Sequence, residues 1–248
     1  MSFYFVGDLH ADNDIRKLSR SYFPEGKHLT EDDYIFVCGD FELVWYPEDF
    51  CVKKFVKNQR HWVSWLQTVF PKTKILVTLG NHENYDLINE LPQIDMFGDK
   101  VRKLNDQIYI FERGRVYTIA GKKILSIGGA LSVDKTWRLT NETKGTGKLW
   151  WEQELWTYKE EHDCLDLLDK YDWKVDYVVS HTAPANVLES MFSIHWDRYV
   201  RIEDPTAKYF QEIYNNLSFK HWWFGHFHED KKWYDFTCAW YNIEKVEI

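Results

Sequence analysis

The chain has 248 residues, of which 44% are hydrophobic and 28% are charged, enough apolar material for a large core. Its formal net charge of −8 argues against nonspecific binding to nucleic-acid backbones, which needs clustered Lys and Arg. A nucleotide substrate stays open, because bound cations can invert the local field. The 13 Trp and the 18% aromatic content are best explained by core packing.

The four cysteines are scattered without paired spacing, at Cys38, Cys51, Cys164 and Cys238. This pattern favours reduced, mostly buried thiols of a cytosolic protein over a disulfide framework or a zinc ribbon. The N-terminal residues lack a basic region and a long apolar stretch, so we expect no signal peptide. No stretch has the length of a membrane span. We therefore expect a cytoplasmic protein with no membrane partner.

The first 90 residues alternate short apolar strands with helices. Strands are predicted at Phe3–Val6, Asp33–Cys38 and Lys74–Leu79. Helices are predicted at Asp12–Arg20, near Asp49–Phe70 and at Tyr85–Glu90.

After about Lys100 the pattern changes to successive short strands separated by glycine turns. These strands are predicted at Ile108–Phe111, Val116–Ala120 and Lys123–Ile127. A polar loop containing several glycines is then predicted from Gly128 to Gly147. The remaining elements are a long helix, a strand, a second helix and a strand, at Trp150–Lys170, Val175–Ser180, Pro205–Asn215 and Lys220–Phe224, with strand-like segments up to Ile248.

No linker rich in Pro, Gly or Ser divides the chain, and no repeat is found, which predicts a single domain over residues 1–248. The mixture of βα units with meander-like strands predicts the α/β (α+β) class. The expected architecture is a sandwich of two mixed β-sheets flanked by helices.

Five segments place ligand-type side chains directly after an apolar strand. They are Gly7-Asp8-Leu9-His10, Gly39-Asp40, Gly80-Asn81-His82-Glu83, Ser180-His181 and Gly225-His226-Phe227-His228. The carboxyl ends of strands are where separate loops of an α/β sheet converge on a ligand. In extended backbone, residues two apart project to the same side, so we expect Asp8 with His10, and His226 with His228, to reach into one site. The preceding glycines permit tight turns and close approach.

The donors in these segments are carboxylates, an amide and imidazoles, with no thiolate. This set suits Mn, Fe, Zn or similar ions and argues against a structural zinc site. Each segment alone has an ordinary explanation, because Asp40 could merely cap the next element and His181 could merely hydrogen-bond to backbone. Their joint occurrence after successive strands favours a metal site.

The order Asp-x-His, Gly-Asp, Gly-Asn-His-Glu, His, Gly-His-x-His resembles the motifs of the calcineurin-like metallophosphoesterases, and it extends from Asp8 to His228. The resemblance implies a β-sandwich flanked by helices, with the site at strand ends. It also implies two divalent metal ions, with manganese expected first and Fe, Zn, Ni or Mg as other candidates. One ion would be bound by Asp8, His10, Asp40 and His228, and the other by Asp40, Asn81, His181 and His226, so that Asp40 bridges them.

The same resemblance implies the hydrolysis of a phosphomonoester or a phosphodiester. Two cations about 3.5–4 Å apart can share a water, lower its pKa toward neutrality and orient a phosphate for in-line attack. A hydroxide bridging both metals would be the nucleophile. His82 would bind no metal, but would lie beside the scissile phosphate and assist the leaving oxygen as a general acid.

Other residues are weaker candidates. Arg138 and Lys135 could bind a substrate phosphate and Asp134 could orient a histidine, although we interpret their segment first as a solvated loop. Glu42 and Trp45 could shape the mouth of a pocket. A substrate-covering insertion could include His195, Trp196, Arg198 and Arg201. The histidines interpreted as structural or surface residues are His28, His61, His162 and His221.

The second segment departs from the protein Ser/Thr phosphatases and the diadenosine tetraphosphatases. Those relatives carry Gly-Asp-x-x-Asp-Arg-Gly there, and an Arg before Gly-Asn-His. This chain has Gly39-Asp40-Phe41-Glu42-Leu43-Val44-Trp45, and Leu79 stands before Gly80, so the Arg that clamps phosphate in that branch is absent. Both assignments are weakened, while the metal motif is intact.

Two alternatives to an enzyme of this kind stay open. A catalytically inactive, protein-binding scaffold of the same fold is disfavoured, because no motif residue is replaced. A nuclease or nucleotide phosphodiesterase is the other alternative, and the acidic balance disfavours nucleic acid as a partner. The sequence specifies neither the substrate nor the oligomeric state.

Overall fold

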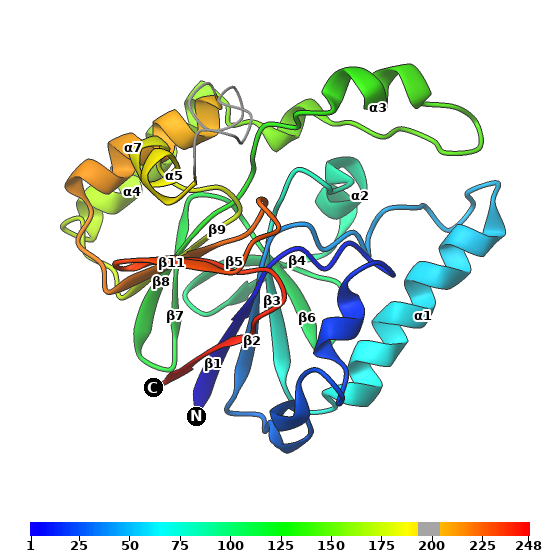
Figure 1. The fold of residues 1–248 in the computed structure, drawn as a ribbon, viewed down its shortest axis with the longest axis horizontal. Coiled ribbons are helices and arrows are strands. Elements are labelled where there is room, and N and C mark those ends of the chain that lie inside the picture. Colours follow the sequence, from blue (N-terminus) through cyan, green and yellow to red (C-terminus); the bar gives the residue numbers. More distant parts are fainter. Residues whose placement is uncertain (193–203) are drawn as a thin grey trace.

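Two β-sheets pack face to face, and helices cover their outer sides (Figure 1). The computed structural model describes residues 1–192 and 204–248. The strand order is β13-β1-β2-β3-β6-β5-β4 in the first sheet and β11-β12-β10-β9-β8-β7 in the second. The predicted α/β class with two mixed sheets flanked by helices is therefore confirmed.

The first sheet has a parallel centre with antiparallel margins. Its strands are β1 (Ser2–Val6), β2 (Tyr34–Cys38), β3 (Lys74–Thr78), β4 (Gln93–Met96), β5 (Asp99–Lys103), β6 (Ile108–Phe111) and β13 (Glu244–Glu247). Strands β1, β2, β3 and β6 run parallel, whereas β5 and β4 continue the sheet as an antiparallel hairpin. Strand β13 pairs antiparallel with β1, which places the two termini side by side (Figure 1).

The second sheet repeats this plan. Its strands are β7 (Arg115–Ile119), β8 (Lys122–Ile127), β9 (Tyr177–Ser180), β10 (His221–Phe224), β11 (Lys231–Trp233) and β12 (Phe236–Cys238). Strands β8, β9, β10 and β12 run parallel, and β7 and β11 close the edges in antiparallel pairing. Each sheet thus brings several carboxyl ends of parallel strands to one edge.

The helices form two groups on opposite sides of the sheets (Figure 1). On the first sheet lie α1 (Lys53–Val69) and α2 (Tyr85–Glu90), and on the second lie α4 (Tyr158–Lys170), α5 (Ala185–Met191) and α7 (Pro205–Asn216). The short helix α3 (Lys135–Asn141) and the 3-10 helices η1 (Ile15–Leu18), η2 (Pro24–His28) and η3 (Glu152–Glu154) lie in the connecting segments. Among the described helices, none has the length and apolarity needed to cross a membrane.

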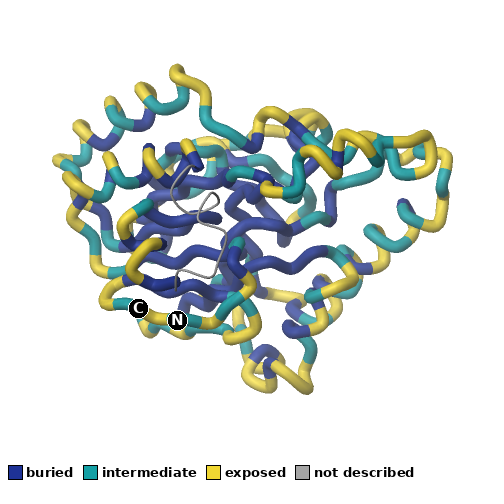
Figure 2. The backbone as a smooth tube through the Cα atoms, turned by 45° about the horizontal axis from the view of Figure 1, so that its top comes forward, coloured by how far each residue is buried: buried dark blue, intermediate teal, exposed yellow. Residues whose placement is uncertain are grey.

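The core consists of three layers, because the strands are buried on both faces. Along β1, Phe3 and Phe5 face the other sheet, whereas Tyr4 and Val6 face the helices. The layer between the sheets is strongly aromatic, and the ring of Phe5 stacks on Trp223 of β10 with 3.7 Å between centroids. Figure 2 shows these strands as a buried centre under exposed helices and loops. The prediction that aromatic residues mostly fill the core agrees with this layer.

Several stretches differ from the prediction, and one of them is the predicted polar loop Gly128–Gly147, which contains helix α3. Only Ile15–Leu18 is helical within the predicted helix Asp12–Arg20. The predicted helix Trp150–Lys170 is shorter in the structure, where α4 begins at Tyr158. The side chain of Thr157 caps this helix and exchanges hydrogen bonds with Glu160. Helix α5 was not predicted. The hairpin β4–β5 was also missed, since its polar residues lie at an edge of the sheet and carry little hydrophobic pattern.

All four cysteines are free, and three of them are buried, as predicted. The exception is Cys51, which is exposed. Burial raises the pKa of the Cys164 thiol to about 11, so this thiol is protonated and unreactive at neutral pH. The described thiols therefore carry neither a disulfide nor the donors of a zinc ribbon.

Truncating the inter-sheet aromatic stack should weaken the fold. Trp223 is 3% exposed, so Trp223→Ala leaves a cavity and is expected to lower the free energy of unfolding by about 3–5 kcal/mol. Urea unfolding followed by circular dichroism measures the change. Tyr234 is 84% exposed, and Tyr234→Ala should change that free energy by less than about 0.5 kcal/mol. Equal losses in the two variants would contradict the packing role assigned to Trp223.

Candidate metal centre

The five motif segments meet where parallel strands of both sheets end. Asp8, Asp40 and Asn81 follow β1, β2 and β3 of the first sheet, whereas His181 and His226 follow β9 and β10 of the second. Backbone hydrogen bonds join the segments, from the amide of Asp8 to the carbonyl of Gly39 and from Gly225 to His181. The donors are thus held by the sheets themselves rather than by free loops.

The backbone at these segments is left-handed, not extended. Five of the seven predicted ligands have positive φ angles: Asp8 (50°), His10 (41°), Asp40 (53°), His226 (72°) and His228 (49°). The expectation that residues two apart converge because the chain is extended is therefore wrong. Left-handed conformations cost non-glycine residues about 1–3 kcal/mol each and cluster at functional sites. Here they turn the side chains inward.

Two glycines allow the segments to approach one another, as expected. A Cβ atom on Gly80 would lie 2.1 Å from Oδ1 of Asp40, and a Cβ atom on Gly39 would lie 2.1 Å from Nδ1 of His181. Both contacts are far shorter than van der Waals contact. Each of these positions therefore requires glycine if the ligand beside it is to keep its place.

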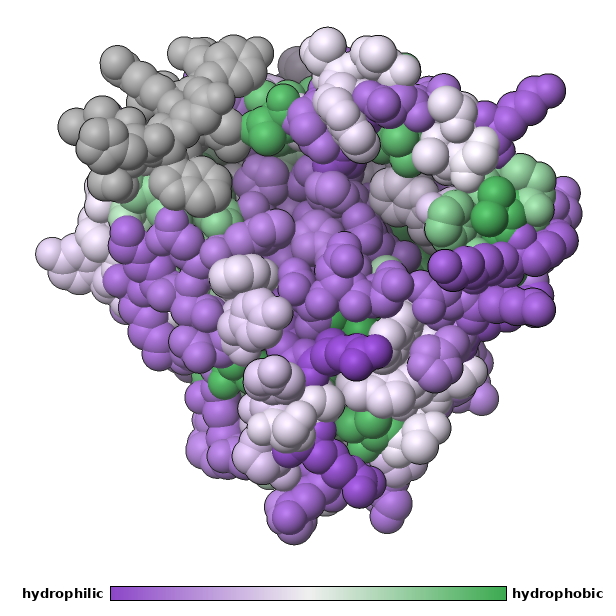
Figure 3. Space-filling model, turned by 45° about the vertical axis from the view of Figure 1, so that its right-hand side comes forward, coloured by the Kyte–Doolittle hydropathy of each residue, from purple (hydrophilic) through white to green (hydrophobic). Residues whose placement is uncertain are grey.

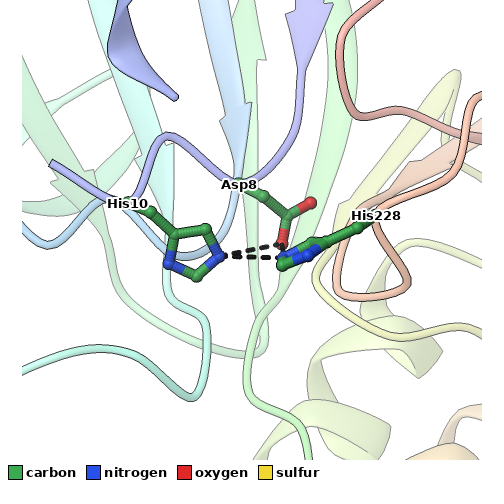
Figure 4. Close-up of side chains that lie close together, drawn as sticks. All are labelled: Asp8, His10 and His228. Carbon is green, nitrogen blue, oxygen red and sulfur yellow. Dashed lines mark hydrogen bonds and ion pairs between the residues drawn. The ribbon is translucent and has the colours of Figure 1, made fainter. Parts of the chain in front are cut away.

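The first group of donors comprises Asp8, His10 and His228, whose side chains point toward one another (Figure 4). Nε2 of His10 lies 2.9 Å from Nε2 of His228 and 3.9 Å from Oδ1 of Asp8. Nε2 of His228 lies 3.6 Å from the same carboxylate oxygen. Two imidazole nitrogens and one carboxylate thus converge on one point, as a divalent cation requires.

The second group is built around His181. Its Nε2 lies 3.1 Å from Oδ1 of Asp40 and 3.0 Å from Oδ1 of Asn81. The other oxygen of Asp40, Oδ2, lies 3.5 Å from Nε2 of His10 in the first group. Asp40 therefore stands between the groups with one oxygen toward each, an arrangement that suits a bridging carboxylate.

His226 is placed differently from the other predicted ligands. Its ring packs against the ring of His181 with 5.0 Å between centroids, and its backbone amide donates to both oxygens of Asp8, at 2.9 and 3.0 Å. Among the described residues, its nitrogens join none of the converging donor groups. The ring of His226 thus lies beside the second group, but its nitrogens do not converge with the donor atoms of that group.

Hydrogen bonds fix the donor atoms of the second group. Nδ1 of His181 donates to the carbonyl of Cys38 at 2.8 Å, which leaves Nε2 facing the site. The amide nitrogen of Asn81 donates to Oγ of Ser132 at 3.1 Å, so its oxygen faces inward. Ser132 is in turn bound to the buried carboxylate of Glu154. The residues present therefore fit a bound cation.

The pKa values of the buried side chains also fit a cation site. Burial alone would lower the pKa of His181, but the carboxylate of Asp40 outweighs it and raises the pKa to about 9. Burial would also lower the pKa of His10, but the hydrogen bond to Glu42 outweighs burial and raises this pKa to about 10. Buried carboxylates are thus balanced by protonated imidazoles, and a cation can replace those protons.

Two buried ionisable side chains outside the predicted ligand set support the segments. Nζ of Lys17 donates to the carbonyls of Gly7 and Asp8, and this side chain is 1% exposed. Glu83 accepts hydrogen bonds from the amides of Phe41 and Glu42, which fixes the turn after Asp40. Burial, reinforced by the charge of Asp40, raises the pKa of Glu83 to about 8. No motif pointed to Lys17.

His82 lies beside the centre, with its two ring nitrogens in different contacts. Its backbone amide donates to Oδ1 of Asp40 at 2.8 Å, and Nδ1 lies 2.8 Å from Oε1 of Glu42. Nε2 contacts the guanidinium of Arg138. Since a guanidinium only donates, Nε2 accepts that bond and the ring proton lies on Nδ1, toward Glu42. Burial alone would raise the pKa of Glu42, but hydrogen bonds from His10 and His82 hold it at about 2.

The interpretation of residues around Arg138 as a solvated loop is wrong. Arg138 belongs to α3 and is 3% exposed. Its guanidinium donates to the carbonyl of Asn81 at 3.1 Å and to the carboxylate of Asp134 at 2.8 Å. Asp134 therefore orients an arginine rather than a histidine. The ammonium of Lys135 lies over the ring of Trp150.

The remaining candidate residues lie in three different places. Glu42 and Trp45 line a pocket beside His82. His28, His61 and His162 are exposed, and His221 contacts Oγ1 of Thr237. The insertion residues His195, Trp196, Arg198 and Arg201 lie outside the described residues.

The sequence comparison agrees with the geometry of the centre. The family model of the calcineurin-like phosphoesterases matches residues 1–230, which include every predicted ligand and His82. No curated protein matches the chain closely enough to count as a relative. The chain belongs to the calcineurin-like phosphoesterase family, whose activity is the metal-dependent hydrolysis of phosphoric esters.

Proposed function

We propose that the chain hydrolyses a phosphate monoester or diester with two divalent cations at this centre. The observation that carries the proposal is the position of Asp40. This carboxylate is 1% exposed, and its two oxygens face two separate groups of donors. Burying a carboxylate is costly unless cations lie beside it, and each of the two donor groups that flank Asp40 could supply such a cation by binding a metal ion in place of its imidazole protons.

The residues divide between two ions. Asp8, His10, Asp40 and His228 would hold one cation, and Asp40, Asn81, His181 and His226 would hold the other. Nitrogen and oxygen donors of this kind accept Mn, Fe, Zn, Ni or Mg, and manganese is our first choice. When bound, such a pair would supply an activated water near neutral pH and would neutralise phosphate oxygens.

His82 is assigned to the leaving group. One of its ring nitrogens lies within 4.8 Å of donor atoms of His10 and Asp40, and Glu42 fixes the orientation of its ring at the edge of the centre. Because Arg138 contacts Nε2, a phosphate oxygen that engages this guanidinium would free Nε2 to carry a proton to the leaving oxygen. Arg138 also supplies, from another element, the cation that is absent before Gly80.

Asp40→Asn should lower the metal content of the purified protein. The change removes the carboxylate that is proposed to bridge the two cations, so we expect at least one equivalent of manganese to be lost after dialysis, as measured by mass spectrometry of metals. Asp95→Asn is the control, because the Asp95 side chain is 81% exposed on β4. Unchanged occupancy in Asp40→Asn would count against the bridge.

Metal binding should release protons, and its apparent affinity should rise with pH. The raised pKa values of His181, about 9, and His10, about 10, mean that both imidazoles hold protons at pH 7, and a cation must displace them. Between pH 6 and 8 the affinity for manganese should rise about tenfold per pH unit for each displaced proton. Calorimetry in buffers of different ionisation enthalpy counts these protons; an affinity independent of pH would refute the assignment.

His82→Ala should keep its metal but lose turnover. Removing a general acid is expected to lower kcat by about 10²- to 10⁴-fold. Manganese-loaded protein is assayed on aryl phosphates, nucleotides and their diesters, with metal content measured on the same samples. His28→Ala is the matched control, because His28 is exposed and outside the centre. Full turnover in His82→Ala would overturn its role, and no turnover by the natural chain on any ester would favour a scaffold.

A further inference from the structure

The pocket beside His82 is separate from the metal donors. Its volume is about 360 Å³, and none of the seven predicted ligands lines it. His82, Glu42 and Arg138 form its inner end, whereas its outer walls come from α1, α3 and the loop after β2. The face shown in Figure 3 is hollowed at a hydrophilic centre. A group held in this pocket would extend from the leaving oxygen, beyond the cations.

Aromatic side chains dominate the outer walls of the pocket. Tyr46 and Phe55 stack on each other, with 4.9 Å between ring centroids and 17° between ring planes. Trp45 continues this wall, and Trp137 on α3 completes the lining while 59% exposed. An exposed indole at the rim offers a flat face to a ligand, and stacking on such faces contributes about 1–3 kcal/mol per base.

One wall is held rigid before any ligand arrives. The side-chain oxygen of Gln59 accepts the amides of Trp45 and Tyr46 at 3.2 and 2.9 Å, and its nitrogen donates to the carbonyl of Tyr46 at 2.7 Å. One N–H of Gln59 is left for a ligand, and the side-chain amide of Asn58 makes no hydrogen bond to another described residue. Little ordering is needed for a ring to bind against this wall.

The charges of the lining indicate what the pocket excludes. Three carboxylates, of Asp12, Glu42 and Asp134, and the cations of Lys54 and Arg138 line the pocket, but Glu42 is paired with His10 and Arg138 with Asp134. A leaving group that carried further phosphates, or an acidic peptide, would therefore lose its hydration with no net positive charge among the described lining residues to offset the loss. An uncharged aromatic group meets no such penalty, and it would cover the apolar faces.

We propose that this pocket binds the aromatic ring of an uncharged leaving alcohol, so that the preferred substrates are phosphate esters of ring-bearing alcohols. The proposal rests on the proposed function of the neighbouring centre. The ring could be an aryl group or a nucleobase, and the two sources share the flat aromatic face that Trp137 would stack against.

Four esters of primary alcohols test the proposal with manganese-loaded protein. Adenosine 5′-phosphate is paired with ribose 5-phosphate, and benzyl phosphate with cyclohexylmethyl phosphate, together with the methyl diester of each. Within each pair the leaving chemistry is similar and the aromatic ring is present or absent. Trp137→Ala should lower kcat/KM for the ring-bearing ester about tenfold more than for its partner. Trp137→Phe should keep most of the preference.

The controls separate this proposal from the proposed function. Tyr158→Ala removes another exposed ring, on α4, and should leave both ratios unchanged. Equal effects of Trp137→Ala on both members of both pairs would overturn the pocket assignment, and loss of preference in one pair alone identifies the ring it binds. If the natural chain hydrolyses none of the esters, the proposed function fails. Calorimetry with adenosine against ribose, and with benzyl alcohol against cyclohexylmethanol, then decides the pocket alone: weaker ring binding in Trp137→Ala supports it, and unchanged or undetectable binding refutes it.

Discussion

The position of one buried carboxylate, that of Asp40, constrains the rest of the centre. Its Oδ1 accepts the backbone amide of His82 at 2.8 Å and lies 3.1 Å from Nε2 of His181, while its Oδ2 faces His10. Burial alone would raise the pKa of Asp40, but the charge of His181, together with the hydrogen bond from its ring, holds the pKa well below its usual range. This charge stays in place only if its neighbours also stay in place. A side chain at Gly80 would displace it, because the Cβ atom would collide with the carboxylate of Asp40.

The aromatic sandwich supplies the rigidity that this arrangement needs. Five ligand residues hold left-handed backbone, so the strand ends carry strain that a loose scaffold would release. The layer between the sheets opposes such relaxation, because stacked pairs such as Phe5 with Trp223 fix one sheet against the other. The donors come from both sheets, so any sliding between the sheets would separate Asp40 from His181. The packing of the core thus fixes the geometry of the candidate metal centre.

The sequence predicted the fold class, and six of the seven side chains predicted as ligands lie together, because each motif is local and follows a strand visible in the hydrophobic pattern. The reason given for their convergence was wrong, since left-handed turns rather than extended backbone aim Asp8 and His10. Support from distant segments escaped prediction. Ser132 and Arg138 reach the centre only through the packing of the chain after β8, and no spacing in the sequence encodes that approach. Arg138 was considered, but its burial depends on tertiary contacts.

The candidate metal centre and the proposed leaving-group pocket are built from different elements of this chain, and α3 joins them. The candidate metal donors stand at strand ends, whereas the outer walls of the pocket come from the helices α1 and α3 and from the loop after β2. Adjacent residues of α3 face both parts, since Arg138 contacts His82 and Trp137 lines the pocket. A shift of this seven-residue helix would therefore change the leaving-group pocket and the hydrogen bonding of His82 together. The proposed substrate preference and the proposed proton transfer would be coupled through this one short element, and Arg138 also links it to the candidate ligand Asn81.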